Sequence, residues 1–422
     1  MSDHVFVGFG FGPIQAGLFA KEAFESGNFR RIVVAEIDQR LVDAVHANHG
    51  TYYVNVARSD RVETVRVDNV ELFNPTRDSE VRKALAEATE IATCLPSVSF
   101  YDSDKPDTVA ALIAEGLRAR KSDATIVYAA ENNNHAAEFL ERAVGKRMGT
   151  PLPPRVQYLN TVIGKMSQVV TDPVEIAARN LAPIAPGIDR AFLVEEFNRI
   201  LVSKTTIPGF APGIEVFLEK DDLLPFEEAK LYGHNAIHAL LGFIGTLKGY
   251  VKMPEIRSDA SLLRVARDAF INESGGALIR KYASLGDDLF TEPGYRAYAE
   301  DLLVRMTNSH LADAVARASR DVARKLAVND RIFGTMALAL EHGIEPKNMA
   351  MGALAGVALL LTGDTTRGLP GRAESLDWRP LHPESLARTL TWLWKTPLSP
   401  LLRRIIDYTY SAGNPLNDLL TR

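Results

Sequence analysis

Residues 227–238, EEAKLYGHNAIH, gather more titratable and amide groups than the surface of a helix needs for solubility. Lys230, Asn235 and His238 stand close together in this stretch, and the apolar run ALLGFIG follows at once. On an α-helix, His238 lies about 80° and Asn235 about 140° around the axis from Lys230, so all three share one face. A lysine with a lowered pKa can act as a base, a carboxamide can donate to a developing alkoxide, and an imidazole can orient a hydroxyl. The set predicts a site at which a hydroxyl group loses its proton.

Two other interpretations of this stretch stay open. His234 and His238 have the i,i+4 spacing of a zinc-binding helix. However, Asn235 stands where such a helix carries its catalytic glutamate, and the sequence offers no clear third ligand. The second alternative is a core helix whose histidines are structural and whose preceding charges face solvent.

A glycine-rich turn, GFGFGPIQAG, follows the β-rich run HVFVGF and opens the helical stretch IQAGLFAKEAFES. Gly10 and Gly12 match the first two glycines of the dinucleotide-binding fingerprint, and Gln15 stands at the third position. The first glycine permits a tight turn, and the second lets the backbone approach a pyrophosphate that sits at the helix N-terminus. The turn predicts a nicotinamide dinucleotide site lined by Gly10, Gly12 and Gln15.

The second predicted strand, RIVVAEIDQR, ends in acids where a ribose-binding carboxylate belongs. Glu36 is predicted to accept a hydrogen bond from the 2′-hydroxyl and to repel a 2′-phosphate, which favours NAD over NADP, whereas Arg40 favours NADP. Thr93, in the strand-like segment EIATCLP, is a further predicted cofactor contact. An ordinary βαβ unit with a glycine-rich turn and a solvated acidic strand end is the alternative.

The segments up to residue 205 alternate between strand-like and helix-like patterns, and those beyond it are almost all helical in periodicity. The alternation predicts an N-terminal Rossmann-type, doubly wound α/β domain over residues 1–205 that binds the dinucleotide. A mostly helical, all-α domain over residues 206–422 is predicted to bind substrate and carry the catalytic groups. The IPGFAPG stretch (207–213) is the predicted joint. Residues 365–384 are predicted to form a loop before a last pair of short helices.

Composition restricts the partners that the protein can have. The 422 residues are 24% charged and 46% hydrophobic, which is typical of a folded globular protein. A net charge of -5 gives no basic surface for nucleic acid or an anionic membrane. The single cysteine cannot form an intrachain disulfide, and no apolar run reaches the ~20 residues of a membrane span. We therefore predict a cytoplasmic protein that has no secretory signal.

Several motifs, taken in order, resemble those of one known family. K-x-x-x-x-N-x-x-H, formed here by Lys230, Asn235 and His238, resembles the signature of the polyol-specific long-chain dehydrogenases, the mannitol dehydrogenase family. The resemblance extends from the first strand to about residue 361 through FGFGPIQAG, AEIDQ, AAENNN, INESGGALI, RDVARKLAVNDRI and LEHGIEPKN. It implies a metal-independent, NAD-dependent oxidoreductase, monomeric or homodimeric, that acts on a small molecule. The enzyme would interconvert a linear polyol, or its phosphate, and the corresponding ketose by hydride transfer.

The resemblance also implies roles for individual residues. Lys230 would be the acid/base, Asn235 and Asn132 would polarise the substrate oxygen, and His238 would position the substrate. Glu227, in the pattern E-E-x-K, resembles the glutamate that gates proton exit in mannitol 2-dehydrogenases.

Substrate choice is predicted from the RDVARKL segment, which resembles a substrate-binding part of the family. Arg320, Arg324 and Lys325 could hold a phosphate by bidentate and point-charge contacts, unless they form an exposed basic helix face. The C-terminal motifs resemble most those of members that use mannitol 1-phosphate, which is the favoured substrate. An unphosphorylated mannitol 2-dehydrogenase or a hexonate (hexuronate) reductase is the alternative.

Two departures from the family pattern leave open a function other than catalysis. Ala16 stands where the family carries an arginine after the glycine turn, and NTVIGKMS (160–167) departs from the family's D-R-[IM]-x-P. A catalytically degenerate protein that binds a dinucleotide as a sensor would tolerate both departures.

Overall fold

The computed structural model describes residues 4–362 and 382–421, which form two compact units, Met1–Phe226 and Glu227–Arg422. The first unit extends past the predicted boundary at 205/206 because strands β11 (Leu201–Ser203) and β12 (Leu218–Lys220) belong to its main sheet, in which β11 pairs with β8 and with β12. The predicted joint at 207–213 lies between these strands, where the Gly213 amide donates to the buried Glu90 carboxylate. The predicted loop at 365–384 falls mainly outside the described residues.

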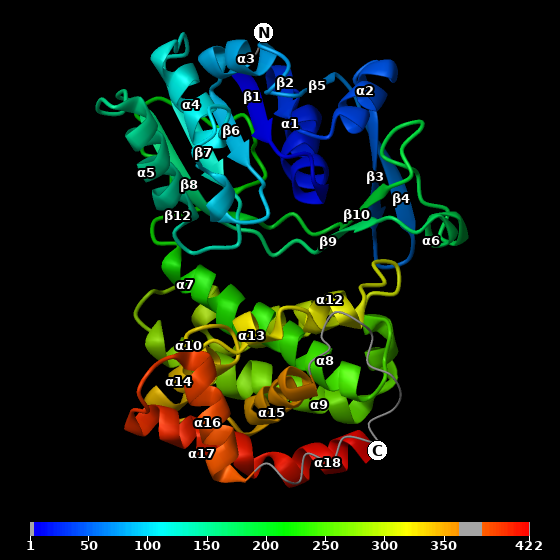
Figure 1. Cartoon of the computed structure of the whole chain (residues 1–422), viewed down its shortest axis with the longest axis vertical. Coiled ribbons are helices and arrows are strands. Elements are labelled where there is room, and N and C mark those ends of the chain that lie inside the picture. Colours follow the sequence, from blue (N-terminus) through cyan, green and yellow to red (C-terminus); the bar gives the residue numbers. More distant parts are fainter. Residues whose placement is uncertain (1–3, 363–381, 422) are drawn as a thin grey trace. The chain divides into compact units, whose positions relative to one another are not determined.

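The main sheet of the first unit has a Rossmann-type topology, as predicted (Figure 1). Its strands stand in the order β12-β11-β8-β7-β6-β1-β2-β5, and the six from β8 to β5 all run parallel. The order reverses at β1, which lies between β6 and β2, and dinucleotides bind at such a switch point in doubly wound sheets. The six parallel strands are β1 (His4–Phe9), β2 (Phe29–Ala35), β5 (Val70–Phe73), β6 (Glu90–Thr93), β7 (Thr125–Ala129) and β8 (Val156–Val162).

Helices cover both faces of this sheet, which explains why its strands are apolar runs rather than alternating patterns. Val5 and Val7 face one core, and Phe6 between them faces the other. The first core is closed by α3 (Glu80–Glu87), α4 (Val109–Arg118) and α5 (Ala136–Met148), which lie side by side in Figure 1. The second is closed by η1 (Gln15–Phe19), α1 (Ala20–Ser26) and α2 (Gln39–Ala47). The one-turn 3₁₀-helix η2 (Val98–Phe100) follows β6.

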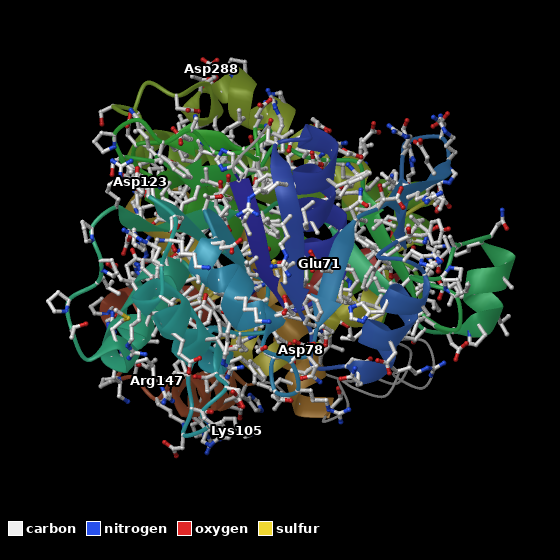
Figure 2. The ribbon with its side chains drawn as sticks, turned by 90° about the horizontal axis from the view of Figure 1, so that it is seen from above. Glu71, Asp78, Lys105, Asp123, Arg147 and Asp288 are labelled. Atoms are coloured by element: carbon white, nitrogen blue, oxygen red, sulfur yellow. The ribbon has the colours of Figure 1, made fainter. Side chains whose placement is uncertain are left out.

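A second, four-stranded sheet in the first unit was not predicted. Its order is β4-β3-β10-β9, with β3 and β10 parallel and the outer pairs antiparallel. Buried Asn55 ties it together by donating to the carbonyls of Ala182 and Phe192. The elements are β3 (Tyr52–Ala57), β4 (Val62–Val67), β9 (Ser167–Val170), α6 (Pro173–Ala178) and β10 (Ala191–Glu195). At the far edge of the main sheet, Arg31 donates two hydrogen bonds of 2.8 Å to Glu71, which Figure 2 labels.

The second unit is mainly helical, as predicted. Gly352 and Gly356 let α15 approach α8 closely, because a Cβ at either position would lie 2.8 Å from Leu240 or Phe243. No helix within residues 4–362 and 382–421 is long and apolar enough to cross a membrane. The helices are α7 (Leu224–Glu228), η3 (Ala229–Asn235), α8 (Ala236–Leu247), η4 (Met253–Ser258), α9 (Ala260–Asp268), η5 (Ala269–Gly275), α10 (Gly276–Lys281), η6 (Asp288–Phe290), α11 (Glu292–Met306), α12 (Val315–Ser319), α13 (Val322–Lys325), α14 (Phe333–Glu341), α15 (Lys347–Thr362), α16 (Pro383–Trp394), α17 (Pro400–Ser411) and α18 (Gly413–Thr421).

Candidate active site

The glycine turn at the end of β1 lies at the switch point of the main sheet. Gly10 has φ +79° and a Cβ there would lie 3.0 Å from the Cys94 carbonyl, so a side chain is excluded both by conformation and by space. Its amide donates to the Ala35 carbonyl at 2.9 Å, which fixes the turn against β2. A Cβ added at Gly12 would meet no atom within 4 Å, so the turn leaves open space at that position. The turn fits the phosphate end of a dinucleotide.

Glu36 joins the glycine turn to the end of β2. Its carboxylate accepts hydrogen bonds from the backbone amides of Phe11 at 2.7 Å and Asp38 at 2.8 Å. A carboxylate has about four acceptor sites, so capacity remains for the hydroxyls of a ribose. Arg40 is turned to other partners, since it donates to the Gly187 carbonyl and to Asp189.

Gln15 replaces the third glycine of the fingerprint, and the structure shows how the chain accommodates it. The side chain is fully buried in π-helix η1, against Gly8 of β1, where a Cβ would lie 2.1 Å from the carboxamide nitrogen. In the fingerprint the third glycine allows the helix to pack closely on the strand; here the missing side chain of Gly8 makes room for Gln15 instead. Neither carboxamide atom of Gln15 has a hydrogen-bond partner among the described residues. An unpartnered buried amide of this kind is a candidate ligand contact.

The carboxyl ends of β6 and β7 are joined by Glu131, for which the sequence alone predicted no role. Its buried carboxylate accepts hydrogen bonds from the Thr93 hydroxyl and the Leu95 amide, both at 2.9 Å, and from the Tyr101 hydroxyl. Thr93 is therefore fully buried and engaged by Glu131. Asn132 follows directly and is exposed. Glu131 thus fixes the loop that presents Asn132.

Lys230 and Asn235 lie in η3, which is a π-helix rather than the regular α-helix that was predicted. A π-helix closes its hydrogen bonds between residues five apart instead of four. Because Lys230 and Asn235 are five apart, the wider turn of a π-helix brings them closer around the axis than the about 140° of an α-helix. His238 follows in the first turn of α8. The π-helix therefore places Lys230 and Asn235 nearer to one face of the helix than the predicted α-helix would.

The surroundings of the Lys230 amine favour its neutral form. Burial, together with the positive charge of Arg331, lowers the pKa of Lys230 to about 8, and the charge of Glu227 opposes this shift. Arg331 is 7% exposed, and its Nε donates to Asp330 at 2.7 Å. Glu227 is buried as well. A lysine with such a pKa is partly neutral near neutral pH and can accept a proton.

His238 is held by the carboxylate of Asp313, for which the sequence alone predicted no role. Its Nε2 lies 3.2 Å from Asp313, whose side chain is 1% exposed. Burial lowers the pKa of His238, and Asp313 offsets part of that effect. His234, 6.5 Å away between ring centroids, has a pKa well below its usual value because of burial and the charge of Arg305. The described residues contain no group of three or more His, Cys, Asp or Glu side chains placed to hold a metal ion, so the zinc interpretation gains no third ligand there.

The predicted basic segment does not form one continuous helix. The chain is extended at Arg320 and left-handed at Asp321, with φ 56°, so α12 ends and α13 begins afresh. Arg320 and Arg324 are exposed, but Lys325 is 5% exposed and its Nζ donates to the Ala318 carbonyl at 2.6 Å. The alternative of an exposed basic face therefore holds for Arg320 and Arg324 and is wrong for Lys325. Burial and the charges of Arg331 and Arg324 lower the pKa of Lys325 to about 7.

The sequence held signals for two of the residues that were missed. Asp313 and Arg317 have the i,i+4 spacing of an ion pair, and Arg331 follows Asp330 just before an apolar run. Both patterns are common on solvent-exposed helices, so Asp313 and Arg331 could be recognised only once the structure showed that they are buried.

Comparison with known proteins places each unit in a family. The family model described as mannitol dehydrogenase Rossmann domain matches residues 5–215, and the one described as mannitol dehydrogenase C-terminal domain matches residues 222–380. The chain is 27% identical over 353 residues to the mannitol-1-phosphate 5-dehydrogenase of Buchnera aphidicola subsp. Acyrthosiphon pisum (strain APS). The aligned region covers 82% of this chain and 84% of the relative.

Two solved structures share the fold at lower sequence identity. A D-sorbitol dehydrogenase in substrate-free form has a TM-score of 0.75 at 18% identity, covering 99% of this chain and 94% of that chain. Pseudomonas fluorescens mannitol 2-dehydrogenase, in a ternary complex with NAD and D-mannitol, has a TM-score of 0.71 at 17% identity. The match covers 100% of this chain and 94% of that chain.

Proposed function

Because this chain belongs to the mannitol dehydrogenase family, we propose that it is an NAD-dependent oxidoreductase that interconverts a linear polyol, or its phosphate, and the corresponding ketose. The observation that carries the proposal is the Lys230 amine, whose pKa is lowered to about 8 and which shares a π-helix with Asn235. A polyol oxidation needs a base for the hydroxyl proton and donors for the developing alkoxide, and these two side chains supply both.

In the proposed reaction, Lys230 takes the proton of the hydroxyl that becomes the carbonyl, and it returns that proton in the reverse direction. The nicotinamide ring, when bound, would accept the hydride. The carboxamide N–H groups of Asn235 and Asn132 stabilise negative charge on the substrate oxygen. His238 orients a second hydroxyl, and Glu227 gates the exit of the proton from Lys230.

The proposed cofactor is NAD, held by Gly10, Gly12 and Gln15 at the pyrophosphate and by Glu36 at the ribose. Two features support NAD over NADP. Glu36 would repel a 2′-phosphate, and Arg40 already donates to Gly187 and Asp189. Thr93 would contribute to the cofactor site indirectly, because its hydroxyl donates to Glu131, which fixes the loop that carries Asn132.

The proposed substrate is mannitol 1-phosphate, with unphosphorylated mannitol or a hexonate as the alternative. Arg320 and Arg324 are exposed and Lys325 is buried beside them, so the segment combines accessible guanidinium groups with a desolvated amine. An anionic substrate group would relieve the mutual repulsion of these cations. A cytoplasmic location and a monomeric or homodimeric state stay part of the proposal.

The decisive test is a panel of polyols, polyol phosphates and hexonates with NAD and NADP. We expect turnover with NAD, and a loss of about 10²–10⁴-fold in kcat for Lys230→Ala while NAD affinity is kept. NAD binding without turnover of any panel member would instead favour the sensor interpretation.

The phosphate part of the proposal has its own test. In Arg324→Ala, kcat/KM for mannitol 1-phosphate should fall about tenfold while that for mannitol is unchanged. Arg296→Ala, which removes an exposed arginine of α11, is the matched control. Equal effects on both substrates would assign Arg324 to some other role.

A further inference from the structure

Asp313 lies at the centre of a buried hydrogen-bonded group that connects α8 to the segment before α12. Its carboxylate receives hydrogen bonds of 2.6 Å from both Nε and Nη2 of Arg317, and it lies 3.2 Å from Nε2 of His238. The backbone is fixed as well, because the Asp313 carbonyl accepts from the Met253 amide at 2.8 Å. The carboxylate therefore has a defined position relative to the imidazole.

The ionisation of Asp313 determines which ring nitrogen of His238 carries a proton. Burial alone would raise the pKa of Asp313, but the hydrogen bonds from His238 and Arg317 hold it below its usual range. An ionised carboxylate can only accept hydrogen bonds. The Nε2 atom of His238 must therefore be the donor in this contact.

The other ring nitrogen is then an acceptor. Burial lowers the pKa of His238, so the ring is neutral near pH 7 and holds a single N–H. With that proton on Nε2, the Nδ1 atom presents a lone pair. Within residues 4–362 and 382–421, Nδ1 makes no hydrogen bond of its own.

We propose that Asp313 is a positioning residue that fixes the Nε2–H tautomer of His238, so that Nδ1 accepts a hydrogen bond from a substrate hydroxyl. The role toward substrate rests on the proposed function. A hydroxyl that donates to Nδ1 keeps its own lone pairs for other contacts. The site would then select substrates that carry a hydroxyl beside the reacting carbon, because a deoxy analogue would leave the imidazole unpaired.

The tautomer can be read directly, without turnover, from the ¹⁵N spectrum of protein labelled at its histidine rings. We expect one signal, absent in His238→Gln, with a proton attached to Nε2 and a non-protonated Nδ1. An Asn at 313 must turn its oxygen to Arg317, which can only donate, and its NH₂ group to His238. Asp313→Asn should therefore move the proton to Nδ1.

The accompanying kinetic effect separates positioning from loss of structure. Asp313→Asn should keep its NAD affinity and lose at least about tenfold in kcat/KM, the scale of one hydrogen bond to a polar group. Arg317→Gln removes the ion pair but leaves the carboxylate, so it should retain the Nε2–H tautomer.

Wild-type protein with the proton on Nδ1, or an Asp313→Asn variant that folds and keeps the Nε2–H tautomer, would overturn the proposal. If Asp313→Asn does not fold, the wild-type and Arg317→Gln spectra decide the question. Failure of the proposed function would look different, since no panel substrate would turn over while the tautomer stayed as described.

Discussion

The charge of Arg331 acts on the Lys230 amine from within the same helical unit. Burial of Lys230 and this neighbouring guanidinium lower the pKa of the amine to about 8, so the positive charge of Arg331 favours the form that can accept a proton. Arg331 is itself buried and paired with Asp330 at 2.7 Å, which keeps it in place.

Replacing Arg331 should therefore raise the pKa of Lys230. In the alcohol-oxidising direction, kcat/KM of the wild type should increase with pH through about 8, because Lys230 must be neutral. In Arg331→Gln the midpoint should move to higher pH, and the rate at pH 7 should fall by up to about tenfold. Arg331→Lys, which keeps the charge, is the control and should shift less. An unchanged pH profile would contradict the role of Arg331.

Glu227 should act in the opposite direction. Its charge raises the pKa of Lys230, so Glu227→Gln should move the midpoint of the same pH profile to lower pH. If Glu227 also gates proton exit, kcat at high pH should fall, since a neutral carboxamide cannot relay a proton. A pH profile that shifts upward, as with Arg331→Gln, would show that the variant acts by disturbing the helix.

The sequence predicted the types of groups at the site better than their arrangement. Lys230, Asn235 and His238 were found because amine, amide and imidazole groups beside an apolar run are unusual. The π-helix that contains Lys230 and Asn235 was not predicted, because π-helices are rare and the periodicity of the sequence indicates only a helix. Sequence alone assigned these side chains to a regular α-helix.

The RDVARKL segment shows the same limit. Its periodicity predicts one helix, but the left-handed Asp321, with φ 56°, breaks it and buries Lys325 instead of exposing it. Asp313 and Arg331 were not predicted, because the sequence does not show which charged residues are buried, and burial is what distinguishes these two from solvent-exposed charges. The parallel sheet, in contrast, was predictable because strand-like and helix-like segments alternate over residues 1–205, which is typical of a parallel sheet covered by helices.

Gln15 supplies a prediction about stability. Its carboxamide is fully buried and unpartnered among the described residues, so Gln15→Met should raise the unfolding free energy of the cofactor-free protein by about 1–3 kcal/mol. If Gln15 contacts the cofactor as proposed, NAD should stabilise the wild type more than the variant, which lacks the carboxamide. Thermal unfolding with and without NAD measures both effects.

The matched control for this change is Gln157→Met. The carboxamide of Gln157 donates to the Lys204 carbonyl and accepts from the Thr206 amide, so its loss should destabilise the protein. A lower melting temperature for cofactor-free Gln15→Met would contradict the assignment.

Lys325→Met should stabilise the protein most at low pH. Below about pH 7 the lysine is charged in both the folded and the unfolded state, and the full cost of burying that charge is present. Between about pH 7 and about 10.4, the folded state has released the proton and the unfolded state still holds it, so the cost decreases. Melting temperatures of the two proteins should therefore converge as pH rises through this window. Lys121→Met, at an exposed lysine, should give a difference that does not vary in this way, and the same constancy in Lys325→Met would contradict the burial of a charged amine.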